Sequence, residues 1–363
     1  MTCCNSQKGQ ARAVLKRIAC PLLLVPILLC TSQLFAAELP AVSITKQAGA
    51  ENPIVITLAS GVTGEQIQRA LDSLPSSGGE IVLPPEKISI RQPILMHRDF
   101  QTLRGSGKGT VLWLADNADC PAIIMGEPVN QPKNLISHLC VRDLAIDGNR
   151  EQQDRETWRL TGEGSEVRNN GITIQGVVDS TIEHVSAAHC RSGGLVTTRG
   201  VRRLTVTDFS SSDNQFDGLA CYQTEDSVFS DLNLHDNPGA GISLDLAFNH
   251  NVISNAVLSA NDLGIFMRFS HENEFDNLSI KDCHHYGVFM ADQAVPMRTG
   301  WASAPETQCT HNAFTNLMAL DCGAAAFRVN DTTCTNNIIV QPKFNGNLMG
   351  GLSEVRPDLI SVR

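Results

Sequence analysis

The sequence predicts an all-β fold, a single-stranded right-handed parallel β-helix with a short N-terminal capping helix. The first observation behind this prediction is a small residue that recurs along the chain. Its copies are Gly171, Gly194, Gly218, Gly241, Gly264, Gly287 and, after an insertion, Ala326. The first six lie 23, 24, 23, 23 and 23 residues apart. A fixed period in this range is typical of stacked repeats, here with coils of about 23 residues.

The second observation is the pattern that follows each small residue. Four residues come next, and the first and third are almost always apolar, as in Ile172-Thr173-Ile174-Gln175. This alternation indicates a β-strand. A second short apolar run follows at a steady offset, and no repeat holds ten residues at helical spacing. Leucine-rich, ankyrin and tetratricopeptide repeats are therefore excluded.

The third observation is a polar position directly before each second apolar run. In successive repeats it holds Ser180, Arg203, Ser227, Asn251, Asn273, Asn312 and Asn337. Stacked asparagine side chains hydrogen-bond to one another along a solenoid, as they do in cross-β stacks. We expect a ladder of this kind along the stack.

The chain begins with a segment that has the features of a secretory signal peptide, residues 1–36. Basic residues precede the apolar stretch Ile18–Leu29, and a small residue suits cleavage before Ala37. An uncleaved anchor or a lipoprotein is the alternative. We expect a secreted, periplasmic or cell-surface protein, with a linker at 37–54 and one β-helix domain at 55–363. No other stretch is long and apolar enough to span a bilayer.

A capping helix is predicted over Thr63–Leu74, where apolar residues recur at helical spacing. Thr63 starts it, and Pro75 with the glycines that follow ends it. The end of a solenoid exposes strand edges and core side chains, so a helix there covers both.

Net charge limits the partners of the protein. The chain has 28 basic and 38 acidic residues, a formal charge of -10. This balance disfavours nucleic acid or a membrane surface as a partner. Local arginines still permit an acidic ligand. We expect a monomer.

Export would permit disulfides. Four of the twelve cysteines belong to the leader. The repeats place Cys283 beside Cys322, and Cys309 beside Cys334, at equivalent positions of adjacent coils. Both disulfides and a ladder of buried thiols fit this placement. No Cys-x-x-Cys occurs, so we predict no metal site of the structural zinc type.

The fourth position after each small residue forms the column that carries the chemistry. Equivalent positions on neighbouring coils lie about 4.8 Å apart, and positions two and four point outward. The column reads Gln175, Thr198, Tyr222, Asp245, Arg268, Ala291 and Asn330. We therefore expect Tyr222, Asp245 and Arg268 to be consecutive neighbours on one exposed face, and we predict these three as catalytic residues.

These three side chains fit proton abstraction next to a carboxylate. Arg268 can neutralise the carboxylate of a uronic acid through a bidentate pair. Tyr222 can act as base or acid if a nearby cation lowers its pKa. Asp245 can orient either one, bind a sugar hydroxyl or hold Ca²⁺, the only cofactor considered. The alternative is a surface ion pair between Asp245 and Arg268.

Flanking residues supply the predicted substrate-binding set. Its members are Gln175, Thr198, Arg199, Asp217, Gln223, His250, His271, Asp292 and Trp301. His250 and His271 also fit simple solvated turn residues. Two insertions, Asp154–Arg168 and Gln293–Gln308, are expected to build a cleft beside the column, because long loops on one face of a solenoid often do so.

Three segments near the start of the predicted domain resemble pectate-lyase-like β-helix proteins. They are Ile67–Leu71, Gly79–Pro84 and Leu103–Gly105. The resemblance covers most of residues 55–345 and implies the fold. It implies no single reaction, because that superfamily includes lyases, hydrolases, epimerases and phage tailspikes.

The segment Ile146–Gln152 resembles the Ile-Asp-Gly-Asn-Arg stretch of alginate (mannuronan) epimerases. In those enzymes the next aligned coil carries Tyr-Gly-Phe-Asp-Pro-His, whose Tyr, Asp and His belong to the active site. Here the same positions hold Gly193, Val196 and Thr198, so none of those roles is carried over. The histidine position of the family falls in the same column as Tyr222.

The sequence thus predicts an exported carbohydrate-active protein with an acidic polysaccharide as its partner. The leading interpretation is a polysaccharide lyase or uronate epimerase that works by C-5 proton abstraction. One alternative is an inverting glycoside hydrolase that uses Asp217 and Asp245, which needs carboxylates about 6.5–9.5 Å apart. Another is a non-catalytic carbohydrate-binding or surface-structural β-helix.

Overall fold

The computed structural model describes residues 43–45, 54–160, 166–291 and 308–363. The chain divides into two compact units, residues 1–38 and 39–363, and all described residues belong to the second. The predicted signal peptide lies outside the described residues. Among the residues that are described, no helix has the length and apolar character needed to cross a membrane.

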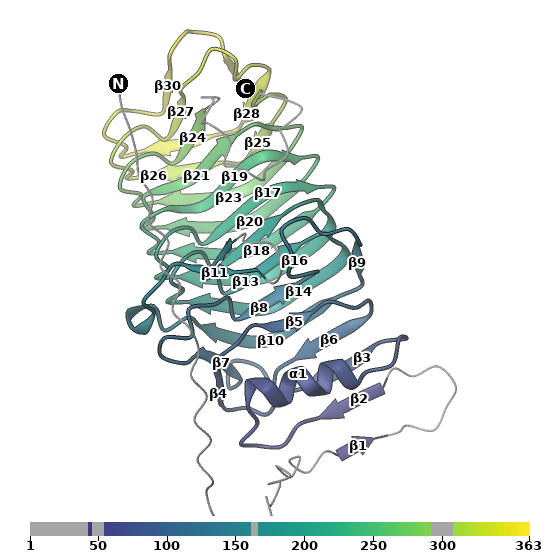
Figure 1. The fold of residues 1–363 in the computed structure, drawn as a ribbon. Coiled ribbons are helices and arrows are strands. Elements are labelled where there is room, and N and C mark those ends of the chain that lie inside the picture. The colour runs from purple at the N-terminus through teal and green to yellow at the C-terminus, as the bar shows by residue number, and fades with distance from the viewer. Residues whose placement is uncertain (1–42, 46–53, 161–165, 292–307) are drawn as a thin grey trace, which may run out of the picture. The chain divides into compact units, whose positions relative to one another are not determined.

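The described part of the second unit is a right-handed parallel β-helix, as predicted (Figure 1). Its strands stack coil upon coil in three parallel sheets. The two apolar runs of each repeat indicated two strands per coil, and the structure has three. The first sheet carries the column and consists of β5 (Ile94–Met96), β8 (Ile123–Met125), β13 (Ile172–Gln175), β15 (Leu195–Thr198), β17 (Leu219–Glu225), β19 (Ala240–Asn249), β21 (Leu263–Arg268), β24 (Val288–Ala291), β27 (Phe327–Val329) and β30 (Leu352–Glu354).

The second and third sheets share long strands. The second sheet comprises β2 (Ile54–Thr57), β3 (Gly79–Val82), β6 (Gln101–Arg104), β10 (Cys140–Asp147), β14 (Val177–Ala188), β16 (Val201–Ser212), β18 (Val228–His235), β20 (Val252–Ser259), β23 (Glu274–Lys281), β25 (Ala313–Thr315), β28 (Asn337–Val340) and β31 (Ile360–Val362). The third comprises β4 (Lys87–Ile90), β7 (Val111–Leu114), the second halves of β10, β14, β16, β18, β20 and β23, then β26 (Met318–Leu320) and β29 (Lys343–Asn345).

A bend separates the two halves of each long strand. The residue at the bend has a positive φ, and in order these residues are Asp143, His184, Asp208, Asp231, Asn255 and Asn277. Asp, Asn and His tolerate the left-handed conformation better than other residues with a side chain. The polar turns seen in the sequence are therefore the corners of the coil.

The core is apolar and continuous along the stack. The first and third residues after the recurring glycine, such as Ile242 and Leu244 after Gly241, are fully buried, as the alternation predicts. Phenylalanines fill much of the interior: Phe209, Phe229, Phe248, Phe275, Phe314 and Phe327 all lie within it.

The predicted amide ladder is present. Asn251, Asn273 and Asn312 each donate a backbone N–H to the side-chain oxygen of the next asparagine, at 2.9–3.2 Å. The position predicted for Arg203 is wrong, because Ser180 pairs with Leu204. Arg203 has a φ of 48° and points outward, where it binds Asp179. A second ladder, of Asn214, Asn237 and Asn261, was not predicted.

The predicted capping helix is confirmed as α1 (Gly64–Ser73), which Figure 1 shows at the N-terminal end of the stack. Thr63 accepts a hydrogen bond from the backbone of Gln66, and the Gln66 side chain accepts one from the Thr63 N–H. This reciprocal capping box fixes the start of the helix. Ile67 and Leu71 are fully buried against the core.

Several short elements decorate the stack. β1 (Ser43–Thr45) lies in the segment predicted as a linker and pairs antiparallel with β2. β9 (Ile136–Ser137) and β22 (Ser270–His271) extend the sheets, and a 3₁₀ turn spans Arg150–Gln152. β11 (Thr157–Arg159) and β12 (Glu166–Arg168) form an antiparallel pair within the first predicted insertion.

The cysteine placement is confirmed, and the thiol alternative holds in this structure. Cys283 and Cys322 lie at equivalent positions of adjacent coils as free thiols, and each donates to the carbonyl two residues before it, Lys281 or Leu320. Cys334 is also a buried thiol, so no bridge joins it to Cys309. Cys309 packs against the ladder, where its sulfur accepts from Asn312 at 3.9 Å.

Candidate functional site

The predicted column is in register along the first sheet. Gln175 pairs with Thr198, Tyr222 with Asp245, and Arg268 with Ala291. Arg268 follows Asp245 directly in the column, because β19 and β21 pair up to Leu244 and Met267. The prediction that Tyr222, Asp245 and Arg268 are consecutive neighbours is therefore confirmed.

The column stands at a corner of the coil. The residue after each of the first five column members has a positive φ: these are Gly176, Arg199, Gln223, Leu246 and Phe269. Beside Asp245 the register between β17 and β19 also shifts, so that Thr224 pairs with Phe248. Such bulges re-aim side chains and are frequent next to functional sites.

The expected exposure of the column is wrong for four of its members. Gln175, Thr198, Asp245 and Ala291 are only 0%, 6%, 4% and 6% exposed, whereas Tyr222 and Arg268 remain partly accessible. Other segments of the chain lie over this corner of the sheet. The alternation along a strand predicts that a side chain points away from the core, but it does not predict that another segment covers that side chain. We call this partly covered corner, with Tyr222, Asp245 and Arg268, the recess.

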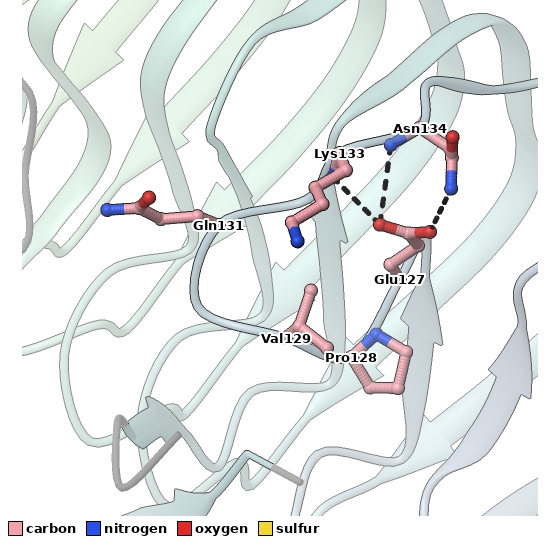
Figure 2. Close-up of a pocket in the computed structure, with 6 residues that line it drawn as sticks. All are labelled: Glu127, Pro128, Val129, Gln131, Lys133 and Asn134. Atoms are coloured by element: carbon pink, nitrogen blue, oxygen red, sulfur yellow. Dashed lines mark hydrogen bonds between the residues drawn. The ribbon is translucent and has the colours of Figure 1, made fainter. Parts of the chain in front are cut away.

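A loop that the sequence did not single out, residues 127–134, contacts Gln175 at the end of the column. Figure 2 shows the side chains of this loop. Glu127 holds this loop together by accepting hydrogen bonds from the Lys133 N–H at 2.9 Å and from the Asn134 side chain at 2.7 Å. A pocket of about 370 Å³ lies within it. The Gln175 amide donates to the carbonyls of Glu127 and Val129, at 3.0 Å for the latter.

Arg199 joins this loop to the column. Its guanidinium donates to Gln175 at 2.8 Å and to Asn130 at 2.7 Å, while its backbone N–H donates to Gln223 at 3.2 Å. Gln175, Arg199 and Gln223 were all predicted to bind substrate. In this structure they brace one another and the loop.

Asp245 and Arg268 form a nearly buried ion pair. Arg268 Nε lies 3.1 Å from Oδ1 and 3.0 Å from Oδ2 of Asp245, and its terminal nitrogen also bonds Oδ2. The pair is 5% and 17% exposed at its side chains, too buried for the surface ion pair that was the alternative. Burial raises the pKa of Asp245, although Arg268 opposes the shift. Ca²⁺ at Asp245 would have to displace the guanidinium.

The surroundings of Tyr222 raise its pKa, whereas a role as a base would require a lowered pKa. Burial raises its pKa, and the nearby carboxylates of Asp217 and Asp245 raise it further. Arg168 and a hydrogen bond with Ser243 lower it by less. The phenol is therefore held in its neutral form, which suits a proton donor and not a phenolate base.

Asp217 approaches this phenol from the start of β17. Burial raises the pKa of Asp217 to about 6, although the Ala240 N–H and the Arg168 guanidinium lower it. The Ala240 N–H donates to Asp217 Oδ1 at 2.7 Å. A carboxyl group exchanges protons most efficiently when its pKa lies near the working pH, and a pKa of about 6 is close to neutral pH.

Arg168 is the site residue that sequence reasoning missed. It lies in β12, in the first predicted insertion, with its guanidinium 4.6 Å from the centre of the Phe216 ring and 2.7 Å from Glu156. The available signal was the position of the insertion, which ends directly before the strand that carries Gln175, the first member of the column. The insertion therefore contributes a cation to the recess, in line with the expected cleft.

Replacing Asp217 with Asn should change the pH dependence of stability. The folded pKa is about 6 against an ordinary value of 3.8. The wild type therefore loses stability as pH rises from about 4 through about 6, and the variant does not. We expect equal urea midpoints near pH 4 and a variant more stable by roughly 2–3 kcal/mol at pH 8. Exposed Asp208→Asn is the matched control, and a pH-independent difference would contradict the shifted pKa.

Thr198 places a buried hydroxyl at this corner. Its hydroxyl oxygen is buried next to Tyr222 and has no hydrogen-bond partner among the described residues. A buried hydroxyl without a partner costs about 1–3 kcal/mol. Such a group is commonly satisfied by a bound molecule or by ordered water.

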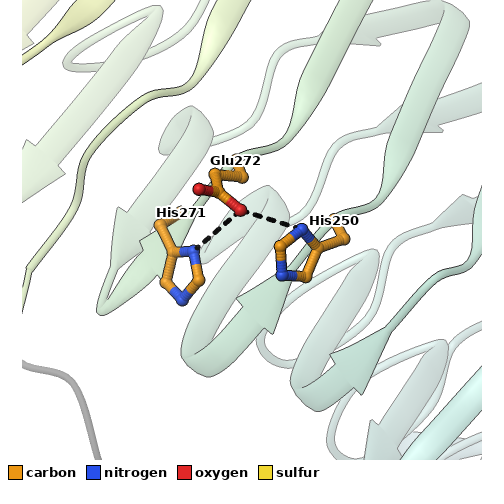
Figure 3. Close-up of side chains that lie close together, drawn as sticks. All are labelled: His250, His271 and Glu272. Carbon is orange, nitrogen blue, oxygen red and sulfur yellow. Dashed lines mark ion pairs between the residues drawn. The ribbon is translucent and has the colours of Figure 1, made fainter.

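His250 and His271 are not members of the column, and they lie next to each other (Figure 3). His250 Nδ1 is 3.0 Å and His271 Nδ1 is 3.8 Å from the same oxygen of Glu272. The two rings meet edge to face with centroids 5.4 Å apart. Both were predicted to bind substrate, and Glu272 was not singled out. Asp292 and Trp301, with the second insertion, lie outside the described residues.

The fold and the recess define the class: a right-handed parallel β-helix with a phenol, two carboxylates and two guanidinium groups at one corner. The chain belongs to the NosD family. The model of that family, described as periplasmic copper-binding protein (NosD), matches residues 133–352. No curated protein sequence matches the chain.

Solved structures share the fold at low sequence identity. The A-module of mannuronan C-5 epimerase AlgE6 from Azotobacter vinelandii has a TM-score of 0.59 and 16% identity, over 83% of this chain and 93% of that one. The periplasmic alginate epimerase AlgG has a TM-score of 0.52 and 11% identity, over 85% of each chain. Pre-mature gene product 12 of bacteriophage phi29 has a TM-score of 0.62 and 13% identity, over 82% of this chain and 42% of that one. The resemblance to alginate epimerases is confirmed at the level of fold.

Proposed function

We propose that this protein is an exported enzyme that removes the C-5 proton of uronate residues in an acidic polysaccharide, as a lyase or an epimerase. The observation that carries the proposal is the recess in which Tyr222, Asp245 and Arg268 follow one another and Asp217 has a pKa of about 6. Carboxylate, phenol and guanidinium groups at one corner provide a base, an acid and an anion-binding group.

Each residue has a separate task in the proposed reaction. Asp217, ionised above pH 6, accepts the C-5 proton. Arg168 and Arg268 stabilise the negative charge that then spreads onto the uronate carboxylate. Tyr222, held neutral, returns a proton. Delivery to the opposite face of C-5 completes an epimerisation, and delivery to the departing O-4 completes an elimination.

Asp245 acts as a positioning residue in this scheme. Both of its oxygens accept from Arg268, so it fixes the plane of the guanidinium beside Tyr222. One terminal nitrogen and the outer edge of the guanidinium are left for a substrate carboxylate. The unpartnered hydroxyl of Thr198 is available for a sugar hydroxyl.

The comparisons support the substrate class and the compartment. Two proteins with this fold carry the names mannuronan C-5 epimerase and alginate epimerase. The NosD family is described as periplasmic, and this is in line with the leader-like segment at residues 1–36. We propose a periplasmic or extracellular protein that works as a monomer.

An inverting glycoside hydrolase is the second candidate, because one observation favours it. The raised pKa of Asp217 also fits the general acid of such an enzyme, with Asp245 as the ionised partner. The guanidinium paired with Asp245 weighs against this role, because a general base must be free to bind water.

Incubation of the mature protein with a panel of uronate polymers in deuterated water separates these reactions. A new ultraviolet absorbance from a double bond identifies a lyase. Deuterium at C-5 without absorbance identifies an epimerase. New reducing ends without either signal identify a hydrolase and overturn the proposal, as does binding of the polymers without any chemical change.

A further inference from the structure

A second group of chemically active side chains lies outside the recess. It consists of His250, His271 and Glu272, whose ligand atoms all lie within 4.8 Å of one another (Figure 3). Glu272 directs a single oxygen at the Nδ1 atoms of both rings. None of the three has a task in the proposed carbohydrate chemistry.

The backbone holds these residues in place. Asn249 pairs with His271 in the parallel register of β19 and β22, so His250 and Glu272 occupy equivalent positions of adjacent coils. Both have positive φ and directly precede a member of the amide ladder, Asn251 or Asn273. The His271 N–H donates to the Asn249 side chain at 3.0 Å. The cluster is thus anchored to the amide ladder and to a paired strand.

We propose that His250, His271 and Glu272 bind a divalent first-row transition-metal ion. Two imidazoles and one carboxylate are donors that suit Zn²⁺ or Cu²⁺, whereas Ca²⁺ prefers a set of six to eight oxygens. Bonds of about 2.0–2.2 Å place two ligands up to about 4.2 Å apart across one ion. The Glu272 oxygen already lies within that span of both Nδ1 atoms, at 3.0 and 3.8 Å, and a small rotation of the half-exposed His250 ring adjusts the separation of the two imidazoles.

The accessible side of the cluster points to an open site. The side chains of His250 and Glu272 are 49% and 52% exposed, and that of His271 is 15% exposed. Three protein ligands leave at least one position for water or an exchangeable ligand, unlike the closed four-ligand sites that stabilise folds.

Calorimetric titration of the untagged, EDTA-treated protein with Zn²⁺ and Cu²⁺ tests the proposal. We expect one ion per chain and no comparable binding of Ca²⁺. His250→Asn, which suits the positive φ, and Glu272→Gln should each lower the affinity by about tenfold or more. The matched control is His285→Asn, because His285 pairs with Asp262 at 2.6 Å without a second imidazole.

Spectroscopy assigns the ligands independently of any activity. The electron paramagnetic resonance spectrum of the Cu²⁺-loaded protein should show coupling to two imidazole nitrogens, reduced to one in His250→Asn or His271→Ala. Thermal midpoints in EDTA that match the wild type show that these variants fold. Absence of one-to-one binding, or binding and spectra unchanged in the His250→Asn/His271→Ala double variant, would overturn the proposal.

Discussion

Replacing Tyr222 with Phe should reduce turnover by about 100-fold or more while polymer affinity changes by less than about threefold. The phenol is held neutral between Asp217 and Asp245, so it is the group that can return a proton. Phe keeps the ring and its packing and removes only the acid. Steady-state turnover and equilibrium binding on the polymer identified by the panel separate the two effects.

Tyr286→Phe is the matched control for this prediction. Tyr286 is the only other tyrosine in the sequence, and it packs against Phe289 of its own coil, with ring centroids 5.2 Å apart. Its removal should leave turnover unchanged. Full activity in Tyr222→Phe would assign proton return to water or another group and leave the phenol as a packing residue.

The fold could be predicted because every coil of a solenoid repeats the same sequence pattern at a nearly constant spacing. The recurring Gly218, Gly241 and Gly264 set the coil length, and the alternation after each one separates core from exterior. The pairing of Tyr222 with Asp245 followed from that count alone, with no knowledge of any distant contact. The capping helix was equally local, because Thr63 and Gln66 close its first turn on themselves.

The state of the site was not predictable, because it depends on segments that leave the repeat. Counting along a strand placed Asp245 on the outer face, yet covering segments leave it 4% exposed and raise its pKa. The same burial reverses the expected shift of Tyr222. Arg168 reaches the recess from an insertion, whose path no periodicity describes.

The metal-binding cluster occupies an intermediate position. His250 and Glu272 each precede a ladder asparagine, and the ladder itself was predicted, so their equivalence was available in the sequence. His271 was recognised as a nearby polar residue. The sequence pattern did not predict where these side chains point, because they lie at a corner with positive φ, where the alternation of a strand no longer applies.

Replacing Arg268 should damage activity most, and the kind of replacement should matter. Lys at this position keeps the charge but loses the planar fork that bonds both oxygens of Asp245 and presents its outer edge to a uronate. We expect Arg268→Lys to fold and to lose two or more orders of magnitude in kcat/KM. Kinetics on the identified polymer, with a urea unfolding curve for each variant, measure both quantities.

Arg268→Ala should fail for an additional reason, because it leaves the Asp245 carboxylate buried without a partner. Breaking a buried pair on one side costs about 3–5 kcal/mol. Because burial already raises the pKa of Asp245, this loss should grow as pH rises and shrink in acid, where the carboxyl becomes neutral. Asp245→Asn in the Arg268→Ala background should restore much of the stability without restoring activity. If Arg268→Ala and Tyr222→Phe both kept full activity, the substrate would have to bind on another face of the β-helix.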